Sequence, residues 1–383
     1  MSKSLTLVSV VGARPQFIKL APLLRSIDRF NEVESNKIKH YTIHTGQHYD
    51  HGMSDIFFEE LEIPHAEYNL GVGSGRHGVQ TGKMLAGIEE LLLELEPDML
   101  IIFGDTNSTV AAALAAAKIH IPIAHVEAGL RSFNRRMPEE INRIASDHIS
   151  DILLAPTPTA VTHLTREGLE EITVLTGDIM YDTVLLNQQL AARKSDILTK
   201  LGLEENTYAV ATVHRAENTD APERLEALLN MFNEIAENHY PIVFPMHPRT
   251  SHRLPSMLPD WKAHPNLRLI EPVGYLDMIQ MLGHARLAFT DSGGLQKEAF
   301  FLNCPCITLR DETEWVETVM AGGNVVVGAN PEKIMQALFQ WKSRFQEEEI
   351  DFAPDIAPYF GEGDAADKIL HAILKYLQPA VAV

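Results

Sequence analysis

The chain has 383 residues, of which 45% are hydrophobic and 22% charged, and this balance is typical of a folded protein and excludes a disordered one. Asp and Glu outnumber Lys and Arg by 52 to 32, which gives a net charge of −20. Such a surface repels nucleic acid and anionic membranes, so we expect neither as the main partner. At about 150 residues per domain, the length predicts two domains or one large one.

Three features of the sequence bear on the cellular location of the protein. No stretch reaches about 18 consecutive apolar residues, so we expect no transmembrane helix. The first residues resemble a strand more than a signal peptide. The only two cysteines, Cys304 and Cys306, are too close in sequence for an unstrained disulfide and fit small buried residues of a strand. We therefore expect a cytoplasmic protein.

Short apolar segments alternate with amphipathic ones along the first half of the chain. The predicted strands are residues 5–11, 40–44, 98–103, 122–126 and 151–155, and the predicted helices between them include 16–30 and 108–120. These strands are apolar on both faces, as in a parallel sheet that helices cover on both sides. The alternation predicts an α/β fold.

The same alternation begins again after about residue 185. Here the predicted strands are 209–213, 241–245, 267–270, 287–290 and 306–309, and the predicted helices are 222–238, 276–282 and 294–301. We therefore predict two Rossmann-like, doubly wound parallel-sheet domains, which face each other across a ligand-binding cleft. Their bounds are 1–185 and 186–364, with the last helix, 365–378, packing back on the first domain.

Two segments combine a strand, a tight turn and the start of a helix, an arrangement that offers free N–H groups to an anion. In the first, Gly12-Ala-Arg-Pro15, Arg14 adds a full charge. In the second, Asp291-Ser-Gly-Gly294, backbone can approach a phosphate closely, and Glu298 lies one turn further on, where it could hold ribose hydroxyls. Arg310 could add a second cation. The alternatives are a plain turn and an ordinary Asp or Ser helix cap.

Four titratable residues follow predicted strands or begin predicted helices. Asp105 could cap the alanine-rich helix, Glu139 could be one of the acids that are common in a first helical turn, and His214 could be a hydrogen-bonded loop residue. Glu127, directly after a strand, has no common structural purpose. Three carboxylates and a histidine that converge in one cleft would suit proton transfer at a sugar carbon.

Six motifs occur in order along the chain, and their combination is specific enough to compare with a known family. They are Gly12-Ala-Arg-Pro, Phe103-Gly-Asp-Thr, His125-Val-Glu-Ala-Gly-Leu-Arg, Met137-Pro-Glu-Glu-Ile-Asn-Arg, Val213-His-Arg-Ala-Glu-Asn and Asp291-Ser-Gly-Gly-Leu-Gln-Lys-Glu. Together, over about residues 5 to 375, the chain closely resembles the non-hydrolysing UDP-N-acetylglucosamine 2-epimerases. The resemblance implies the two-domain glycosyltransferase-B fold, a homodimer, a role in surface polysaccharide precursors, and an isomerase that uses neither cofactor nor metal. It also implies that the second domain binds UDP.

The family reaction interconverts UDP-N-acetylglucosamine and UDP-N-acetylmannosamine by eliminating UDP to a 2-acetamidoglucal and adding it back. By resemblance, the acid/base residues are Asp105, Glu127, Glu139 and His214. The resemblance assigns UDP binding to Arg14, Lys19, His247, Ser292, Gly293, Gly294, Glu298 and Arg310.

The chain departs from the family pattern at Gln16-Phe17, where many members have a glutamate and a small residue. This variant also resembles epimerases of UDP-2,3-diacetamido-2,3-dideoxyglucuronate. The extra carboxylate of that sugar would need a cation, for which the candidates are Arg76, Arg135 and Arg136. Gln47-His48 matches a segment near which some bacterial members bind a second, activating substrate molecule, although the residues after it differ. The rival hypotheses are a UDP-sugar glycosyltransferase of the same fold, a hydrolysing epimerase and a non-catalytic sensor.

Overall fold

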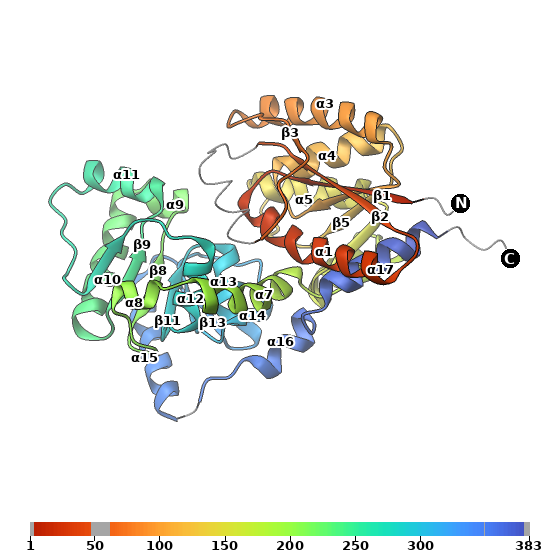
Figure 1. Cartoon of the computed structure of the whole chain (residues 1–383). Coiled ribbons are helices and arrows are strands. Elements are labelled where there is room, and N and C mark those ends of the chain that lie inside the picture. Colours follow the sequence, from red (N-terminus) through yellow and green to blue (C-terminus); the bar gives the residue numbers. More distant parts are fainter. Residues whose placement is uncertain (1–3, 47–61, 348, 379–383) are drawn as a thin grey trace. The chain divides into compact units, whose positions relative to one another are not determined.

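The computed structural model describes residues 4–46, 62–347 and 349–378 of the chain. They form two compact units, and the first unit contains both ends of the chain (Figure 1). Unit 1 consists of residues 1–185 and 357–383, and unit 2 of residues 186–356. Each unit is built on a parallel sheet, so the predicted α/β class with two doubly wound sheets is confirmed.

The sheet of unit 1 has the strand order β3-β2-β1-β4-β5-β6-β7, and every neighbouring pair is parallel. The chain runs outward from β1 to β3 and then returns to place β4 on the other side of β1, so the order reverses between β1 and β4. Such a switch point is where doubly wound sheets bind ligands. The strands are β1 Leu5–Val11, β2 Ile38–His44, β3 Tyr68–Asn69, β4 Met99–Phe103, β5 Ile123–Val126, β6 Ile152–Ala155 and β7 Thr173–Leu175.

Helices cover both faces of this sheet. Figure 1 shows α3 and α4 on one side and α1 and α17 on the other. The helical segments are α1 Arg14–Val33, α3 His77–Leu95, α4 Asn107–Lys118, α5 Pro138–Ile149, α6 Pro158–Arg166, η1 Glu170–Ile172, α7 Ile179–Lys194, α16 Ala353–Phe360 and α17 Ala365–Leu377; of these, α7 and α16 run between the units.

The last helix, α17, is fixed to unit 1 at its start and along its length. The Asp182 carboxylate accepts the backbone N–H groups of Ala365 at 3.1 Å and Ala366 at 2.8 Å. One turn into the helix, Asp367 Oδ1 accepts a hydrogen bond from Ser26 Oγ and pairs with Arg29 Nη2 at 2.6 Å, and both of these residues lie on α1. The two helices therefore lie side by side.

The alanine-rich helix α4 lets the core of unit 1 pack closely around the switch point. Five of its alanines are fully buried with β1, β4 and β5 residues. Near its start, the Ser108 hydroxyl and the Thr45 hydroxyl occupy the space where a side chain on Gly12 would have its Cβ. Only glycine therefore fits at the turn that follows β1.

Unit 2 repeats the plan with the strand order β10-β9-β8-β11-β12-β13, again parallel throughout. The order reverses between β8 and β11. The strands are β8 Ala209–Thr212, β9 Ile242–Pro245, β10 Leu267–Ile270, β11 Leu287–Thr290, β12 Cys306–Thr308 and β13 Asn324–Val326. The helices are α8 Ile197–Leu201, α9 Ala216–Thr219, α10 Pro222–Asn238, α11 Pro248–Met257, α12 Tyr275–Gly283, α13 Gly293–Phe301, α14 Val316–Met320 and α15 Pro331–Glu347.

The elements agree closely with the sequence pattern where that pattern is strong. The helix predicted at 222–238 coincides with α10, whereas the one predicted at 16–30 begins two residues earlier and ends at Val33. The sequence analysis did not predict helix α3, because a glycine-rich stretch precedes it. Both cysteines are buried and free, as expected. Among the described helices, none combines the length and apolar character that a membrane span requires.

Candidate functional site

The predicted residues lie where strands end and helices begin, in two groups that belong to separate units. In unit 1, Asp105 and Glu127 follow β4 and β5, and Glu139 begins α5. In unit 2, His214, His247 and the segment 291–294 follow β8, β9 and β11, and Arg310 follows β12. The structure therefore defines the geometry within each group.

Asp105 is partly exposed, at 29% of its side chain, and is paired with Arg143 of α5. Its Oδ2 accepts hydrogen bonds from Arg143 Nε at 2.9 Å and Nη2 at 2.7 Å. Burial raises the pKa of Asp105, the Arg143 charge opposes that shift, and the nearby Glu127 charge adds to it. The alternative role as cap of α4 is wrong, because Thr106 is the N-cap residue and accepts from Thr109 N.

Glu127 pairs with Lys19 of α1, and both side chains are almost completely buried. Its backbone has a φ of +68°, which is unusual for a residue with a side chain and typical of functional turns. A Cβ on Gly104 would lie 3.2 Å from Glu127 Oε2 and 3.7 Å from Lys19 Nζ. The Lys19–Glu127 pair thus lies directly over the residue before Asp105, and Lys19, predicted to bind UDP, is the counter-ion of a predicted acid/base group.

Glu139 is exposed in the first turn of α5, and in the described part of the chain no hydrogen bond or ion pair joins it to the other predicted acids. Its neighbour Glu140 is buried and accepts from Ser132 N and Phe133 N, both at 2.9 Å. Burial raises the pKa of Glu140, but these bonds and Arg143, at 2.9 Å, outweigh burial and lower it. Glu140 therefore positions Arg143, a link that the sequence analysis missed.

The turn after β1 is held by the side chain of Gln16. Gln16 Oε1 accepts from Gly12 N at 2.8 Å and Ala13 N at 3.1 Å, while its Nε2 donates to Phe103 O at 2.8 Å and Thr109 Oγ1 at 3.0 Å. A carboxylate could not supply the two donations. The side chain of Arg14, in this same turn, lies outside the described residues.

Asp291 organises the turn after β8 in unit 2. Its buried carboxylate accepts from His214 N at 3.0 Å, Arg215 N at 3.0 Å and Asn218 Nδ2 at 2.9 Å. It also lies 3.2 Å from His214 Nδ1. This contact holds the imidazole with Nδ1–H toward the carboxylate and leaves Nε2 available for proton transfer.

His214 is one third exposed, and its ring stacks on that of His247 with 5.2 Å between centroids. Burial lowers the pKa of His214, the Asp291 charge opposes the shift, and His247 and two arginines add to it. Burial likewise lowers the pKa of His247. Both rings are therefore neutral near pH 7, and a neutral His214 can accept a proton.

The start of α13 presents backbone toward open space. Ser292 is the N-cap residue, and its Oγ accepts from Leu295 N at 3.4 Å, so the predicted capping alternative holds for this side chain. A Cβ on Gly294 would meet no atom within 4 Å. On Gly293 it would lie 3.7 Å from Arg310 Nη1 and 3.8 Å from Arg215 Nη2.

The two arginines beside Gly293 differ in their surroundings. Arg310 is buried and pairs with Glu314 at 2.6 Å, so its charge is already neutralised. Arg215 is partly exposed. The sequence analysis did not name Arg215, although its place directly after His214 was a usable signal. Glu298 is nearly buried in the second turn of α13.

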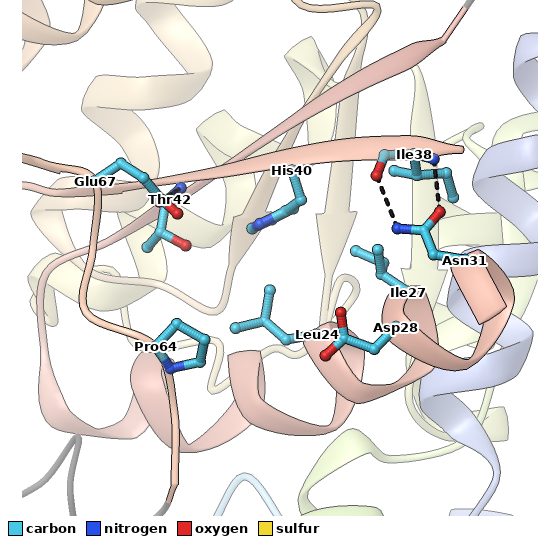
Figure 2. A pocket seen from close by; sticks show the side chains of 9 residues that line it. All are labelled: Leu24, Ile27, Asp28, Asn31, Ile38, His40, Thr42, Pro64 and Glu67. Carbon is cyan, nitrogen blue, oxygen red and sulfur yellow. Dashed lines mark hydrogen bonds between the residues drawn. The ribbon is translucent and has the colours of Figure 1, made fainter. Parts of the chain in front are cut away.

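A pocket of about 210 Å³ lies elsewhere in unit 1, between α1 and β2 (Figure 2). Three of its polar residues are bonded to protein: Asn31 to the Ile38 backbone, Glu67 to Thr42 N at 2.8 Å, and His40 Nε2 to Ser9 Oγ at 2.9 Å. None of the predicted site residues lines it, and it is small for a nucleotide sugar.

Unit 1 contains two neighbouring carboxylates, and unit 2 contains a histidine and a helix start that could bind an anion. These groups are typical of an enzyme that uses acid/base catalysis on phosphorylated ligands. The chain belongs to the UDP-N-acetylglucosamine 2-epimerase family, whose model matches residues 31–374. The resemblance found in the six motifs is thereby confirmed, as is the enzyme class, an isomerase.

Three similar proteins document the relationship. A UDP-N-acetylglucosamine 2-epimerase homolog of Methanococcus maripaludis is 50% identical over 96% of this chain and 99% of its own. A UDP-2,3-diacetamido-2,3-dideoxy-D-glucuronate 2-epimerase of Pseudomonas aeruginosa is 47% identical over 86% and 90%. The crystal structure of the Methanocaldococcus jannaschii UDP-GlcNAc 2-epimerase with UDP-GlcNAc and UDP has 42% identity, covers 97% of this chain and 100% of its own, and gives a TM-score of 0.84.

Proposed function

We propose that the protein interconverts UDP-N-acetylglucosamine and UDP-N-acetylmannosamine without hydrolysing them. The observation that carries this proposal is the cluster in unit 1, where Asp105 and Glu127 lie next to each other with Arg143 and Lys19 as counter-ions. Two carboxylates in different electrostatic surroundings suit the removal of a proton on one face of a sugar and its delivery on the other. The M. jannaschii relative that binds UDP-GlcNAc and UDP supports the substrate class.

The reaction would begin with elimination, because the proton on C2 is not acidic enough for direct removal. The C1–oxygen bond to UDP breaks as a base takes the C2 proton, which leaves a 2-acetamidoglucal. An acid then returns a proton to the opposite face of C2, and the UDP oxygen adds back to C1. Asp105, Glu127, Glu139 and His214 are the proposed acids and bases. Burial raises the pKa of Asp105, which favours a proposed role of this residue as proton donor.

The departing UDP would be held by unit 2, within the proposed UDP-binding domain of residues 186–364. The N–H groups of Gly293 and Gly294 at the start of α13 suit a diphosphate, beside Ser292, whose own N–H donates to Thr290 Oγ1 at 3.0 Å. The side chains proposed to assist are the cations Arg310 and, from this structure, Arg215, the neutral imidazole of His247, and Arg14 and Lys19 of unit 1. Glu298 is proposed to hold ribose hydroxyls. A homodimer in the cytoplasm, without metal or cofactor, completes the proposal.

A second candidate substrate is UDP-2,3-diacetamido-2,3-dideoxyglucuronate, on which the P. aeruginosa relative acts by its name. Its extra carboxylate requires a cation. Arg135 and Arg136 are exposed in the loop before α5, and Arg76 is exposed at the start of α3. Within the described residues, none of the three guanidinium groups has a hydrogen bond or ion pair, so each is available to a carboxylate.

The test is incubation of the full chain with each UDP-sugar in deuterium oxide, followed by proton NMR. Epimerisation places deuterium at C2 and yields the second epimer, and the faster of the two sugars is the substrate. Absence of exchange with both sugars would refute the proposal. Free N-acetylmannosamine with UDP would instead identify a hydrolysing epimerase, a glycosylated acceptor a glycosyltransferase, and binding without turnover a sensor.

A further inference from the structure

His125, in β5, lies between two hydrogen-bond acceptors. The residue is buried, with 1% of its surface exposed. Its Nδ1 is 2.7 Å from Asp147 Oδ1 and its Nε2 is 2.8 Å from the carbonyl oxygen of Gly104. A carbonyl oxygen can only accept, and so can an ionised carboxylate. Both ring nitrogens must therefore carry a proton.

Asp147, in α5, is held in its ionised form by the groups around it. Its Oδ2 accepts from Gly129 N at 3.1 Å and lies 2.7 Å from Arg131 Nη1. Burial raises the pKa of Asp147, but His125 and Arg131 outweigh burial and lower it. Asp147 therefore supplies no proton to the bond with His125.

Asp147 and Glu167 share Arg131, and of the two carboxylates only Asp147 lies in the interior. Arg131 makes two hydrogen bonds to the Glu167 carboxylate, at 2.8 Å and 2.7 Å. Glu167 is 27% exposed and also contacts His148 Nε2 at 3.1 Å. A proton on both nitrogens of His125 places a second cation beside the buried Asp147 carboxylate, which lowers the cost of burying that charge.

The imidazole ring connects the ends of two strands that carry the proposed catalytic acids. Gly104, which accepts from His125, directly precedes Asp105, and Glu127 follows His125 by two residues. A second bond, from Gly104 N to Val126 O at 3.0 Å, joins the same strand ends. Glu127 has a left-handed backbone with φ of +68°, which is costly for a residue with a side chain, so its turn needs such support, whereas Gly104 adopts its φ of +60° without strain.

We propose that His125 donates from both ring nitrogens and is the positioning residue that fixes the Asp105 and Glu127 turns against each other. The side chain touches no reacting atom: Asp147 accepts from its Nδ1–H, and its Nε2–H holds the Gly104 carbonyl. This inference rests on the proposed catalytic roles of Asp105 and Glu127 for its effect on the reaction. The two donated hydrogen bonds stand independently of those roles.

His40 provides a matched comparison within the same unit. The residue is half-buried and lines the pocket between α1 and β2, and its one hydrogen-bond partner among the described residues is the Ser9 hydroxyl, which can donate or accept. Burial lowers the pKa of His40 to about 4. In Figure 2 the His40 side chain points into the pocket beside Leu24. His40 is therefore a neutral histidine, and its replacement leaves the acid cluster intact.

The protonation state is tested by nitrogen NMR on the whole chain with its 17 histidines labelled. The His125 signals are assigned by their loss in His125→Gln, and those of His40 by their loss in His40→Gln. At about pH 7 we expect both His125 nitrogens at imidazolium positions, because both face acceptors, and His40 as a neutral tautomer. A neutral tautomer for His125 at this pH would overturn the proposal, whatever the activity of the enzyme.

The positioning role is tested by two substitutions that each keep one half of the contact. The glutamine amide of His125→Gln reaches the position of Nε2 and the asparagine amide of His125→Asn that of Nδ1. We expect kcat to fall about 100-fold in His125→Asn, and less in His125→Gln, with KM unchanged and His40→Gln at the wild-type rate. Asp147→Asn should turn His125 neutral in the NMR spectrum and lower kcat. Folded variants, checked by melting temperature, that retain wild-type kcat would overturn the positioning role.

Discussion

The two units use their charged residues in different ways. In unit 1 the proposed acids are paired with cations side chain to side chain, Glu127 with Lys19 and Asp105 with Arg143. In unit 2 the buried carboxylate of Asp291 instead accepts backbone N–H groups and shapes a turn. Counter-ions set the proton affinity of a carboxylate, whereas Asp291 takes up the N–H groups of the turn after β8 and fixes its shape. We therefore propose that unit 1 chiefly transfers protons and that unit 2, at the start of α13, chiefly binds the anion.

The strongest test of this division is Asp105→Asn. We expect turnover to fall by about 1,000-fold, because the amide cannot exchange the proton, while UDP affinity measured by calorimetry stays nearly the same. Asp28→Asn, an exposed acid on α1, is the control and should be fully active. A variant that keeps the wild-type rate would remove Asp105 from the mechanism.

Replacing His214 tests whether unit 2 also takes part in proton transfer. We expect His214→Ala to lower turnover about 100-fold with UDP binding preserved, because the side chain that exchanges the proton is lost while Asp291 keeps its backbone bonds. His252→Ala, on the exposed face of α11, is the control. If turnover is unchanged while UDP binding weakens, His214 belongs to the binding turn, and the division between the units becomes complete.

A smaller effect is expected for Arg310→Ala. Loss of one charged contact to the diphosphate should weaken UDP binding by about tenfold, since such contacts contribute about 1.5–3 kcal/mol and Arg310 already shares its charge with Glu314. Calorimetry with UDP measures the change, and Arg268→Ala, on β10, is the control. Unaltered affinity would mean that Arg215, not Arg310, serves the diphosphate.

The smallest effect concerns the attachment of the C-terminal helix to unit 1. Burial raises the pKa of Asp182 from 3.8 to about 6, and the hydrogen bonds from Ala365 and Ala366 oppose the shift. The folded state therefore binds the proton more tightly than the unfolded state, and this contribution to stability is present below about pH 4 and lost as the pH rises through about 6.

Asp182→Asn removes this titration. Between about pH 5 and about pH 7 the loss of the bound proton should lower the melting temperature of the wild type. We expect the melting temperature of the variant to fall by a few degrees less over the same range. Asp351→Asn is the control, because Asp351 is exposed and accepts a single N–H, from Ala353. Equal pH dependence in Asp182→Asn and the wild type would show that the proton is not bound at this carboxylate.

Elements with a strong local pattern were predictable from the sequence, and side-chain pairs were not. Strand Leu267–Ile270 and helix Pro222–Asn238 have clear apolar patterns bounded by prolines or turns. Helix α3 was missed because one buried residue per turn, such as Met84 and Ile88, gives a weak signal after a glycine-rich loop. Short edge strands such as β3 are too brief to show a period.

The site shows the same limit. The motifs place Asp105 and Glu127 at strand ends. Their partners Lys19 and Arg143 lie on helices that are distant in the sequence, so no local spacing predicts these ion pairs. Glu139 and Glu140 are adjacent acids, and only the packing of α5 decides that Glu140 faces inward. Asp147 and His125 are 22 positions apart in the sequence, and they meet because α5 packs against β5.

Gln16 adds a chemical consequence to the turn after β1. Its amide has no ionisable proton, so the four bonds that join Gly12, Ala13, Phe103 and Thr109 do not vary with pH. A glutamate in the same place would have to hold a proton to donate to the Phe103 carbonyl, and the turn would then loosen whenever that proton left. The amide of Gln16 therefore makes the turn before α1 independent of pH, beside the carboxylates that are proposed to transfer protons.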